Sequence, residues 1–237
     1  MAQAKIGKLA LGKVPRVVAI IDEPLPVKRV ERIVDMGADI LEIRVDRFAA
    51  DIDAVAGYVR TLKKSLSIPL LGTITENAQN SGTRLGMFEK IVPLVHAVDI
   101  DIHAGIRDEV VRMASGRTIV VSYHDFRKTP RAAEMGALVD QAIDCGADIV
   151  KIAVVARKTA DVASLMQFTR SRSENLVTIS MGAAGTISRV VAPLFGSLFT
   201  YAYTTKAVAP GQLSLEALVE EMRLFYPSFD EKFNRYA

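Results

Sequence analysis

The chain has 237 residues, of which 50% are hydrophobic and 24% charged, a balance typical of an ordinary globular protein with a large core. The formal net charge of +3 comes from scattered Lys and Arg without a basic cluster among aromatic residues, which argues against nucleic-acid binding. Cys145 is the only cysteine, so an intrachain disulfide and a thiolate zinc site are excluded, and no run reaches the roughly 18 apolar residues of a membrane span. We therefore expect a cytoplasmic protein that does not bind membranes.

Apolar runs alternate with amphipathic segments at intervals of roughly 25 to 30 residues, the pattern of repeated strand–helix units and a parallel sheet. Gly37 and Gly146 each follow a predicted helix and lead into a strand, as left-handed glycines at helix ends commonly do. Strands are expected at residues 17–21, 40–45, 70–73, 98–102, 119–123, 149–155, 177–181 and 198–203. Helices are expected at residues 27–36, 52–66, 87–97, 106–114, 132–145, 160–171, 186–195 and 213–225.

These eight units predict a single-domain (β/α)8 TIM barrel that spans residues 1–237. No linker or low-complexity segment interrupts the series. An open, doubly wound sheet is the alternative, although no Gly-x-Gly-x-x-Gly follows the first strand. The segment 6–11, before the first barrel strand, is expected to form a short strand or hairpin that closes the bottom of the barrel.

The second and fourth strands carry charged residues at positions where a barrel interior normally has apolar ones. Residues two apart on a strand share a face, so Glu42 and Arg44 point the same way, as do Asp99 and Asp101. Together with Lys151 on the sixth strand they can surround one lumen. In a purely structural interpretation, Glu42 and Arg44 form a space-filling ion pair and an aspartate offsets the lysine. Several buried pairs in one barrel are poor stabilisers, which favours a functional site.

The fifth and sixth strands carry the two residues best suited to catalysis. His124 ends the fifth strand, at the mouth where barrel enzymes carry their chemistry, and an imidazole titrating near neutrality suits proton transfer. Lys151 lies within an apolar, β-branched run, so an exposed edge strand is the less favoured alternative. Burial disfavours the ammonium form, so we expect a lowered pKa and an amine able to condense with a carbonyl.

The seventh and eighth strands end in segments that can bind a ligand. After the seventh strand, a glycine-bearing loop leads into a helix that carries Arg189, and this region is expected to hold an anion. A solvated helix position is the alternative for this arginine. After the eighth strand, Gln212 in Ala209-Pro-Gly-Gln offers an amide to the same mouth.

Taken together, these motifs resemble type I 3-dehydroquinate dehydratase, the imine-forming enzyme of the shikimate pathway of aromatic amino acid biosynthesis. The resemblance covers nearly the whole chain, and the motifs in this order are specific in combination. They are Leu41-Glu-Ile-Arg-Val-Asp46, Ser122-Tyr-His-Asp-Phe-Arg-Lys-Thr-Pro130, Asp148-Ile-Val-Lys-Ile-Ala153, Ser180-Met-Gly through Ser188-Arg189, and Ala209-Pro-Gly-Gln212.

The resemblance implies that Lys151 forms an imine with the C3 ketone of 3-dehydroquinate and that His124 moves the protons. The iminium is an electron sink, so His124 can remove the C2 proton and return it to the departing C1 hydroxyl, which yields 3-dehydroshikimate and water. Glu42 and Arg44 would contact the ring hydroxyls, while Arg189 would pair with the carboxylate and Gln212 would orient the substrate. The resemblance also implies a homodimer and a reaction that needs no metal or organic cofactor.

The sequence departs from the family pattern in two places. Thr75 and Gln79 stand where the loop after the third strand usually carries an Arg and a Glu, and Val208 replaces a common serine. These changes bear on substrate affinity and identity more than on the lysine–histidine chemistry. Arg84, in the same loop, is a candidate substitute for the missing cation.

Two other functions remain as alternatives. A class I aldolase or transaldolase also uses a barrel lysine that forms imines, although His124, Arg189 and the Ala-Pro-Gly-Gln motif favour elimination of water. A diverged barrel that binds a shikimate-pathway metabolite without turnover is the second alternative, and the presence of both Lys151 and His124 argues against it.

Overall fold

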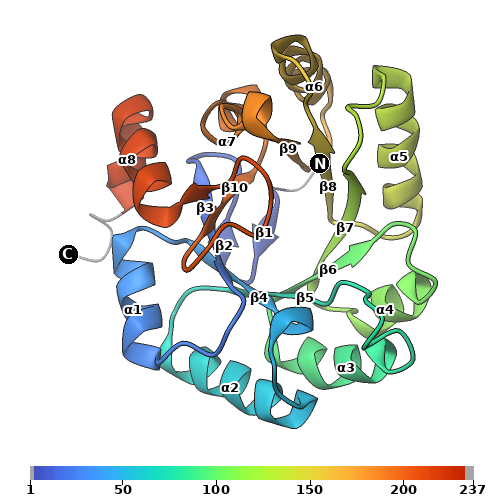
Figure 1. Cartoon of the computed structure of the whole chain (residues 1–237), viewed down its shortest axis with the longest axis vertical. Coiled ribbons are helices and arrows are strands. Elements are labelled where there is room, and N and C mark those ends of the chain that lie inside the picture. The colour runs from blue at the N-terminus through green and yellow to red at the C-terminus, as the bar shows by residue number, and fades with distance from the viewer. Residues whose placement is uncertain (1–2, 233–237) are drawn as a thin grey trace.

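A computed structural model describes residues 3–232 and shows a closed ring of parallel strands surrounded by helices (Figure 1). The (β/α)8 TIM barrel expected from the sequence is confirmed. Its expected bounds, 1–237, extend beyond the described residues. The barrel strands are β3 (Arg16–Ile21), β4 (Ile40–Arg44), β5 (Leu70–Thr73), β6 (Ala97–Asp101), β7 (Thr118–Asp125), β8 (Ile149–Val155), β9 (Leu176–Met181) and β10 (Phe199–Tyr203).

The helices form the outer layer of the barrel, as Figure 1 shows. The longer helices, such as α2 and α8, bury an apolar face and leave polar residues exposed, which accounts for the 3.6-residue periodicity in the sequence. Gly37 and Gly146 follow the first and fifth helices with φ of 131° and 96°, as expected. The helices are α1 (Val27–Met36), α2 (Ile52–Ser65), α3 (Arg84–Ile91), α4 (Arg107–Met113), α5 (Ala132–Asp144), α6 (Thr159–Ser171), α7 (Ser188–Val191) and α8 (Leu215–Phe225).

Neighbouring strands pair in chain order, from β3 with β4 to β8 with β9, and β10 pairs with β3. The ring closes between β9 and β10, where the backbone N–H of Leu198 donates to the carbonyl oxygen of Leu176 (2.9 Å). At the amino end of the strands, the expected hairpin forms from β1 (Lys5–Ile6) and β2 (Leu9–Ala10). Ile6 packs with apolar side chains inside the barrel and so closes its bottom.

Three of the expected helices have wrong boundaries. The helix expected at 87–97 begins at Arg84, so Arg84 lies on α3 and not in the preceding loop. This helix ends at Ile91 and is followed by a 3-10 turn, because Pro93 cannot continue the α-helical hydrogen bonds. Pro193 likewise splits the helix expected at 186–195 into α7 and a 3-10 turn. The last helix begins at Leu215 because Ser214 is its N-cap, with Oγ accepting from the Ala217 N–H (3.2 Å). The short strand β11 (Leu213–Ser214) precedes it and pairs with β10.

The barrel interior changes character from its bottom to its top. At the bottom, inward-facing positions are apolar, as at Ile40, Ala97 and Ile149. Two residues further along the same strands, the inward positions hold Glu42, Asp99 and Lys151, because side chains alternate along a strand. The apolar layer thus forms the floor beneath a charged upper layer at the carboxyl ends of the strands.

Candidate active site

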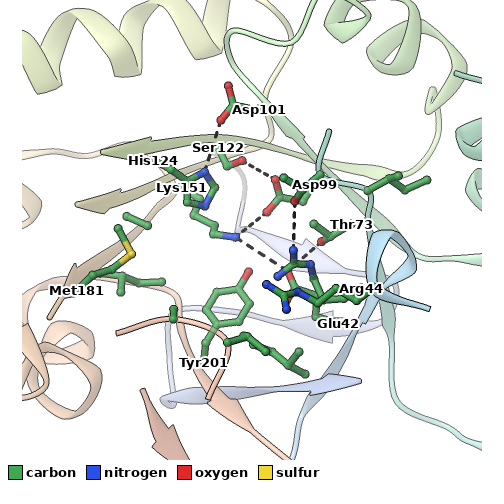
Figure 2. Close-up of a pocket in the computed structure, with 18 of the residues that line it drawn as sticks. Glu42, Arg44, Thr73, Asp99, Asp101, Ser122, His124, Lys151, Met181 and Tyr201 are labelled. Atoms are coloured by element: carbon green, nitrogen blue, oxygen red, sulfur yellow. Dashed lines mark hydrogen bonds and ion pairs between the residues drawn. The ribbon is translucent and has the colours of Figure 1, made fainter. Parts of the chain in front are cut away.

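The charged upper layer opens into a cavity of about 500 Å³ at the carboxyl end of the barrel (Figure 2). All six residues singled out as catalytic or substrate-binding from the sequence line this cavity, and so do Asp99 and Asp101. The six are Glu42, Arg44, His124, Lys151, Arg189 and Gln212. These six come from three strands, one helix and one loop, so only the closed barrel brings them together.

Lys151 lines the cavity and has 7% of its surface exposed. Its Nζ donates a hydrogen bond to Asp99 Oδ2 (2.7 Å) and lies 4.0 Å from Glu42 Oε1. The same nitrogen lies 4.7 Å from the centre of the Tyr201 ring. The alternative of an exposed edge-strand lysine is therefore wrong, because β8 is paired on both sides and Lys151 faces inward.

The expected lowering of the Lys151 pKa was also wrong. Burial does disfavour the ammonium form, but Asp99 and Glu42 outweigh it and raise the pKa of Lys151 above its usual value. The pKa expectation counted only the desolvation, although the same sequence placed Glu42 and Asp99 around one lumen with Lys151. In the free protein the amine is therefore an ammonium ion, held by a buried charge pair.

The two carboxylates beside Lys151 are themselves fixed by hydroxyl groups. Ser122 Oγ donates to Asp99 Oδ1 (2.6 Å), and Thr73 Oγ1 donates to Glu42 Oε1 (2.8 Å). Burial alone would raise the pKa of Asp99, but the charge of Lys151 holds this pKa below its usual range. Asp99 thus remains ionised and keeps Lys151 at a defined place in the cavity.

His124 lies on β7, the strand that pairs with β8, and faces the same cavity as Lys151 (Figure 2). Its Nδ1 lies 3.5 Å from Asp101 Oδ2, and its ring stacks on Phe126 with centroids 6.2 Å apart. Burial would raise the pKa of Asp101, but hydrogen bonds from His124 and from the His103 N–H hold this pKa below its usual value. An N–H at Nδ1 can donate its hydrogen bond to Asp101, which leaves the Nε2 lone pair free to accept a proton.

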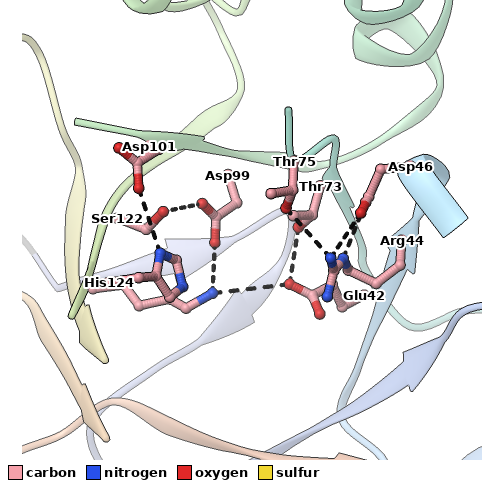
Figure 3. A network of polar contacts seen from close by, with 10 residues as sticks. Glu42, Arg44, Asp46, Thr73, Thr75, Asp99, Asp101, Ser122 and His124 are labelled. Atoms are coloured by element: carbon pink, nitrogen blue, oxygen red, sulfur yellow. Dashed lines mark hydrogen bonds and ion pairs between the residues drawn. The ribbon is translucent and has the colours of Figure 1, made fainter. Parts of the chain in front are cut away.

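Arg44 does not pair with Glu42, so the structural interpretation of those two residues was wrong. Its guanidinium binds Asp46 through Nε (3.1 Å) and Nη2 (2.8 Å), and Nη2 also donates to Thr75 Oγ1 (3.3 Å), as Figure 3 shows. Glu42 instead faces Lys151 and Thr73. The other part of that interpretation, an aspartate that offsets the lysine, is present as the Asp99–Lys151 pair.

Arg189 is buried, with 2% of its surface exposed, so the alternative of a solvated helix position was wrong. Its Nε and Nη2 are buried and have no hydrogen-bond partner within residues 3–232, and burial lowers its pKa to about 10. A buried guanidinium with unfilled donors is suited to an anionic ligand. Gln212 lies on the same cavity, and its Oε1 accepts from the Val208 N–H (2.9 Å), which leaves its NH2 group as the donor.

The residues that depart from the family pattern lie in different places. Thr75 and Val208 line the cavity, whereas Gln79 lines a separate pocket beside α2 and α3. Arg84, the candidate substitute cation, lies on the cavity wall with 3% of its surface exposed. Its Nε donates to the Ile74 carbonyl oxygen (2.7 Å) and its Nη1 pairs with Glu76 (3.1 Å).

Sequence reasoning did not identify three inward-facing residues as part of the site. Thr73, Ser122 and Tyr201 line the cavity and contact the charged residues described above. The alternation of strand residues could have found Ser122, because it shares a face with His124. On their own strands, no residue singled out in the sequence lies two positions from Thr73 or Tyr201, so these two lacked such a signal.

A closed parallel barrel with ionisable side chains gathered in a cavity at the carboxyl ends of its strands has the architecture of a barrel enzyme. The sequence model of the family described as "Type I 3-dehydroquinase" matches residues 24–228. The chain belongs to the type I 3-dehydroquinase family.

Relatives and solved structures agree with this assignment. The 3-dehydroquinate dehydratase of Methanococcoides burtonii is 37% identical over 93% of this chain and 98% of its own length, and that of Methanosarcina barkeri is 36% identical over 92% and 98%. The crystal structure of 3-dehydroquinate dehydratase from Geobacillus kaustophilus matches with a TM-score of 0.83 at 27% identity, covering 95% of this chain and 96% of that one.

A further match is the type I enzyme from Clostridium difficile, in a crystal structure with covalently modified comenic acid. It has a TM-score of 0.82 at 27% identity and covers 95% of this chain and 98% of that one. The family membership decides against the class I aldolase and against a barrel without turnover. Among the described residues, no helix is both long and apolar enough to cross a membrane.

Proposed function

We propose that this chain dehydrates 3-dehydroquinate to 3-dehydroshikimate, with Lys151 as the imine-forming residue and His124 as the general acid and base. The observation that carries the proposal is the buried amine of Lys151, which lies in the same cavity as the His124 imidazole and as the unfilled donors of Arg189. The reaction is that of the family to which the chain belongs.

The carboxylates around Lys151 have opposite effects on the two halves of the reaction. They favour the ammonium form, so the amine must release a proton before it attacks the ketone, and Asp99 already accepts its hydrogen bond (2.7 Å). Once the imine has formed, the same negative charges favour the cationic iminium, which is the electron sink that makes the neighbouring C–H acidic. The carboxylates thus lower the fraction of neutral Lys151 amine and stabilise the cationic iminium intermediate.

His124 then transfers the proton. With Nδ1 directed at Asp101, Nε2 is the nitrogen free to accept the C2 proton, and the resulting imidazolium is stabilised by the Asp101 carboxylate. The imidazolium returns the proton to the departing C1 hydroxyl, and hydrolysis of the product imine releases 3-dehydroshikimate and restores Lys151.

The remaining candidates would bind and orient the substrate. Arg189 would pair with the carboxylate through the donors that have no partner among the described residues, and Gln212 would donate through its NH2 group. Glu42 and Arg44 would contact the ring hydroxyls from the opposite wall, where Asp46 and Thr73 hold them in place.

The test is to trap the intermediate on the unmodified protein. Incubation with 3-dehydroquinate followed by borohydride reduction is expected to leave one covalent adduct, which peptide mass spectrometry places on Lys151. Without borohydride, absorbance from the conjugated enone is expected to grow. Folded protein that gives neither adduct nor enone would contradict the proposal.

Arg84 is expected to contribute to substrate binding through its charge. Replacing Arg84 with methionine keeps most of the side-chain volume and removes the guanidinium from the cavity wall, so KM for 3-dehydroquinate should rise about tenfold or more, the typical effect of one lost charge-assisted hydrogen bond. Steady-state kinetics measures this. Glu76→Gln is the matched control, since it removes the charge paired with Arg84 and leaves the guanidinium in place. Equal kcat/KM in Arg84→Met and the unmodified enzyme would reject the role.

We further propose that the whole chain forms one catalytic domain and works as a homodimer in the cytoplasm. The homodimer is inferred from the family resemblance. The side chains of Leu194, Leu224 and Phe225, exposed on adjoining parts of the helical layer, offer an apolar surface for a second copy. Sedimentation velocity distinguishes a dimer from a monomer.

A further inference from the structure

The hydroxyl group of Tyr201 is buried without a hydrogen-bond partner in the part of the chain that the structure describes. Tyr201 lies on β10, has 3% of its surface exposed and lines the catalytic cavity. Two other tyrosines of the barrel are satisfied, since Tyr58 donates to the Leu25 carbonyl oxygen (2.9 Å) and Tyr226 to that of Val190 (2.6 Å). An unpaired buried hydroxyl is uncommon and costs stability, so it calls for an explanation.

Packing does not explain the hydroxyl. The ring of Tyr201 contacts that of Phe199, two residues earlier on the same inward face, with centroids 5.7 Å apart. A phenylalanine at 201 would keep this contact and the contact of the ring with Lys151. The hydroxyl group is therefore the part of the side chain that makes no hydrogen bond within the described residues.

The groups around the Lys151 amine differ in what they can offer a substrate. Asp99 and Glu42 are carboxylates, which only accept hydrogen bonds. Figure 2 shows the Tyr201 hydroxyl pointing into the cavity toward the Lys151 amine. Burial raises the pKa of Tyr201 well above its usual value. The charge of the Lys151 ammonium group and its proximity to the hydroxyl oppose this rise but are smaller effects, so the phenol keeps its proton and can donate to a bound ligand.

A ketone that reacts with Lys151 must bring its carbon to the amine, and its oxygen then lies among these same groups. The carboxylates repel that oxygen as it gains negative charge. We propose that the Tyr201 hydroxyl donates a hydrogen bond to the ketone oxygen of the bound substrate and stabilises it as Lys151 attacks. This inference rests on the proposed function, which supplies the ketone and the nucleophilic role of Lys151.

The step balances without transfer of the Tyr201 proton. The lone pair of the neutral amine forms the carbon–nitrogen bond, and the π electrons of the carbonyl move onto oxygen. That oxygen accepts the Tyr201 hydrogen bond while it carries the charge, and then takes a proton from the new ammonium nitrogen to give the neutral carbinolamine. Tyr201 acts as a fixed donor at the developing oxyanion.

The test is Tyr201→Phe, followed by quenched single-turnover trapping with borohydride. The rate at which the Lys151 adduct appears is expected to fall about tenfold to a hundredfold, toward the loss seen when one oxyanion donor is removed from other enzymes. The unfolding midpoint is expected to stay equal or to rise, because the variant loses an unpaired buried hydroxyl and no hydrogen bond within the described residues.

Tyr58→Phe is the matched control, because its hydroxyl has a protein partner and does not line the cavity. It should lower the unfolding midpoint and leave the trapping rate unchanged, the reverse of Tyr201→Phe. An unchanged trapping rate in Tyr201→Phe, or a raised KM alone, would overturn the inference while the unmodified enzyme still forms the adduct. Absence of the adduct in the unmodified enzyme would overturn the proposed function, and this inference with it.

Discussion

Replacing Lys151 with methionine is expected to abolish both turnover and the borohydride-trapped adduct. Methionine has similar length and no amine, so the cavity keeps its shape and loses the nucleophile. The expected loss in kcat is at least about a thousandfold, since no other lysine lines the cavity in the part of the chain that the structure describes. Steady-state kinetics and peptide mass spectrometry measure the two effects.

The same substitution should also destabilise the fold in a pH-dependent way. It leaves Asp99 and Glu42 buried beside each other without their cation, at a cost of about 3–5 kcal/mol. In the unmodified protein the pKa of Asp99 is lowered. The ionised carboxylate therefore stabilises the fold fully at pH values above its ordinary pKa of 3.8, and this stabilisation is lost as the pH falls through the lowered pKa. Without Lys151, burial raises this pKa instead, and protonation of Asp99 relieves the penalty as the pH falls. Denaturation should therefore show a larger loss at about pH 8 than at about pH 5.

The double variant Lys151→Met/Asp99→Asn separates chemistry from folding. The Asp99→Asn change removes one unpaired charge, so part of the lost stability at neutral pH should return while activity stays absent. A Lys151→Met protein that still yields an adduct, or one whose stability loss does not depend on pH, would contradict this account of the site.

Replacing His124 with glutamine is expected to slow the dehydration by a factor of about 10² to 10⁴ and to leave imine formation largely intact. Glutamine can still form hydrogen bonds but cannot accept and return a proton near neutral pH. Lys151 keeps its own contacts to Asp99 and Glu42, so it can still condense with the ketone. The substrate imine should therefore accumulate, and mass spectrometry after borohydride should find an adduct heavier by one water than the product adduct.

His96→Gln is the matched control for this variant. His96 lies at the opposite end of the barrel, where its Nδ1 accepts the Leu70 N–H (3.0 Å), and glutamine keeps an acceptor there. Its kinetics should match those of the unmodified enzyme. If His124→Gln turned over 3-dehydroquinate at an ordinary rate, the general acid and base would have to be another residue.

Both predictions depend on the distribution of charge across the cavity. Lys151 faces carboxylates on β4 and β6, whereas the cation with open donors, Arg189, lies on the opposite side after β9. This separation lets one wall stabilise a cationic intermediate while the other binds an anionic group of the same substrate. Apolar residues beneath the site keep the interior dry, which strengthens both interactions.

Much of the fold could be predicted because it depends on local patterns. Apolar runs indicated all eight barrel strands, and 3.6-residue periodicity indicated the helices between them. The helix errors arose near Pro93, Pro193 and Ser214, where a single residue ends or caps a helix. Strand alternation also placed Glu42 and Lys151 on inward faces. These features follow from the order of side chains along one element, which the sequence contains in full.

The partners of those side chains required the tertiary structure. Distances in the folded barrel decide that Lys151 pairs with Asp99 and that Arg44 binds Asp46 and not Glu42. They also decide that the Tyr201 hydroxyl has no hydrogen-bond partner among the described residues. The sign of the Lys151 pKa shift changed for the same reason, since it is the sum of desolvation and of charges that other strands supply. The sequence by itself determined which side chains face the interior of the barrel. The closure of the barrel decided which of their charges lie close together, because electrostatic energies depend on distance in space and not on separation along the chain.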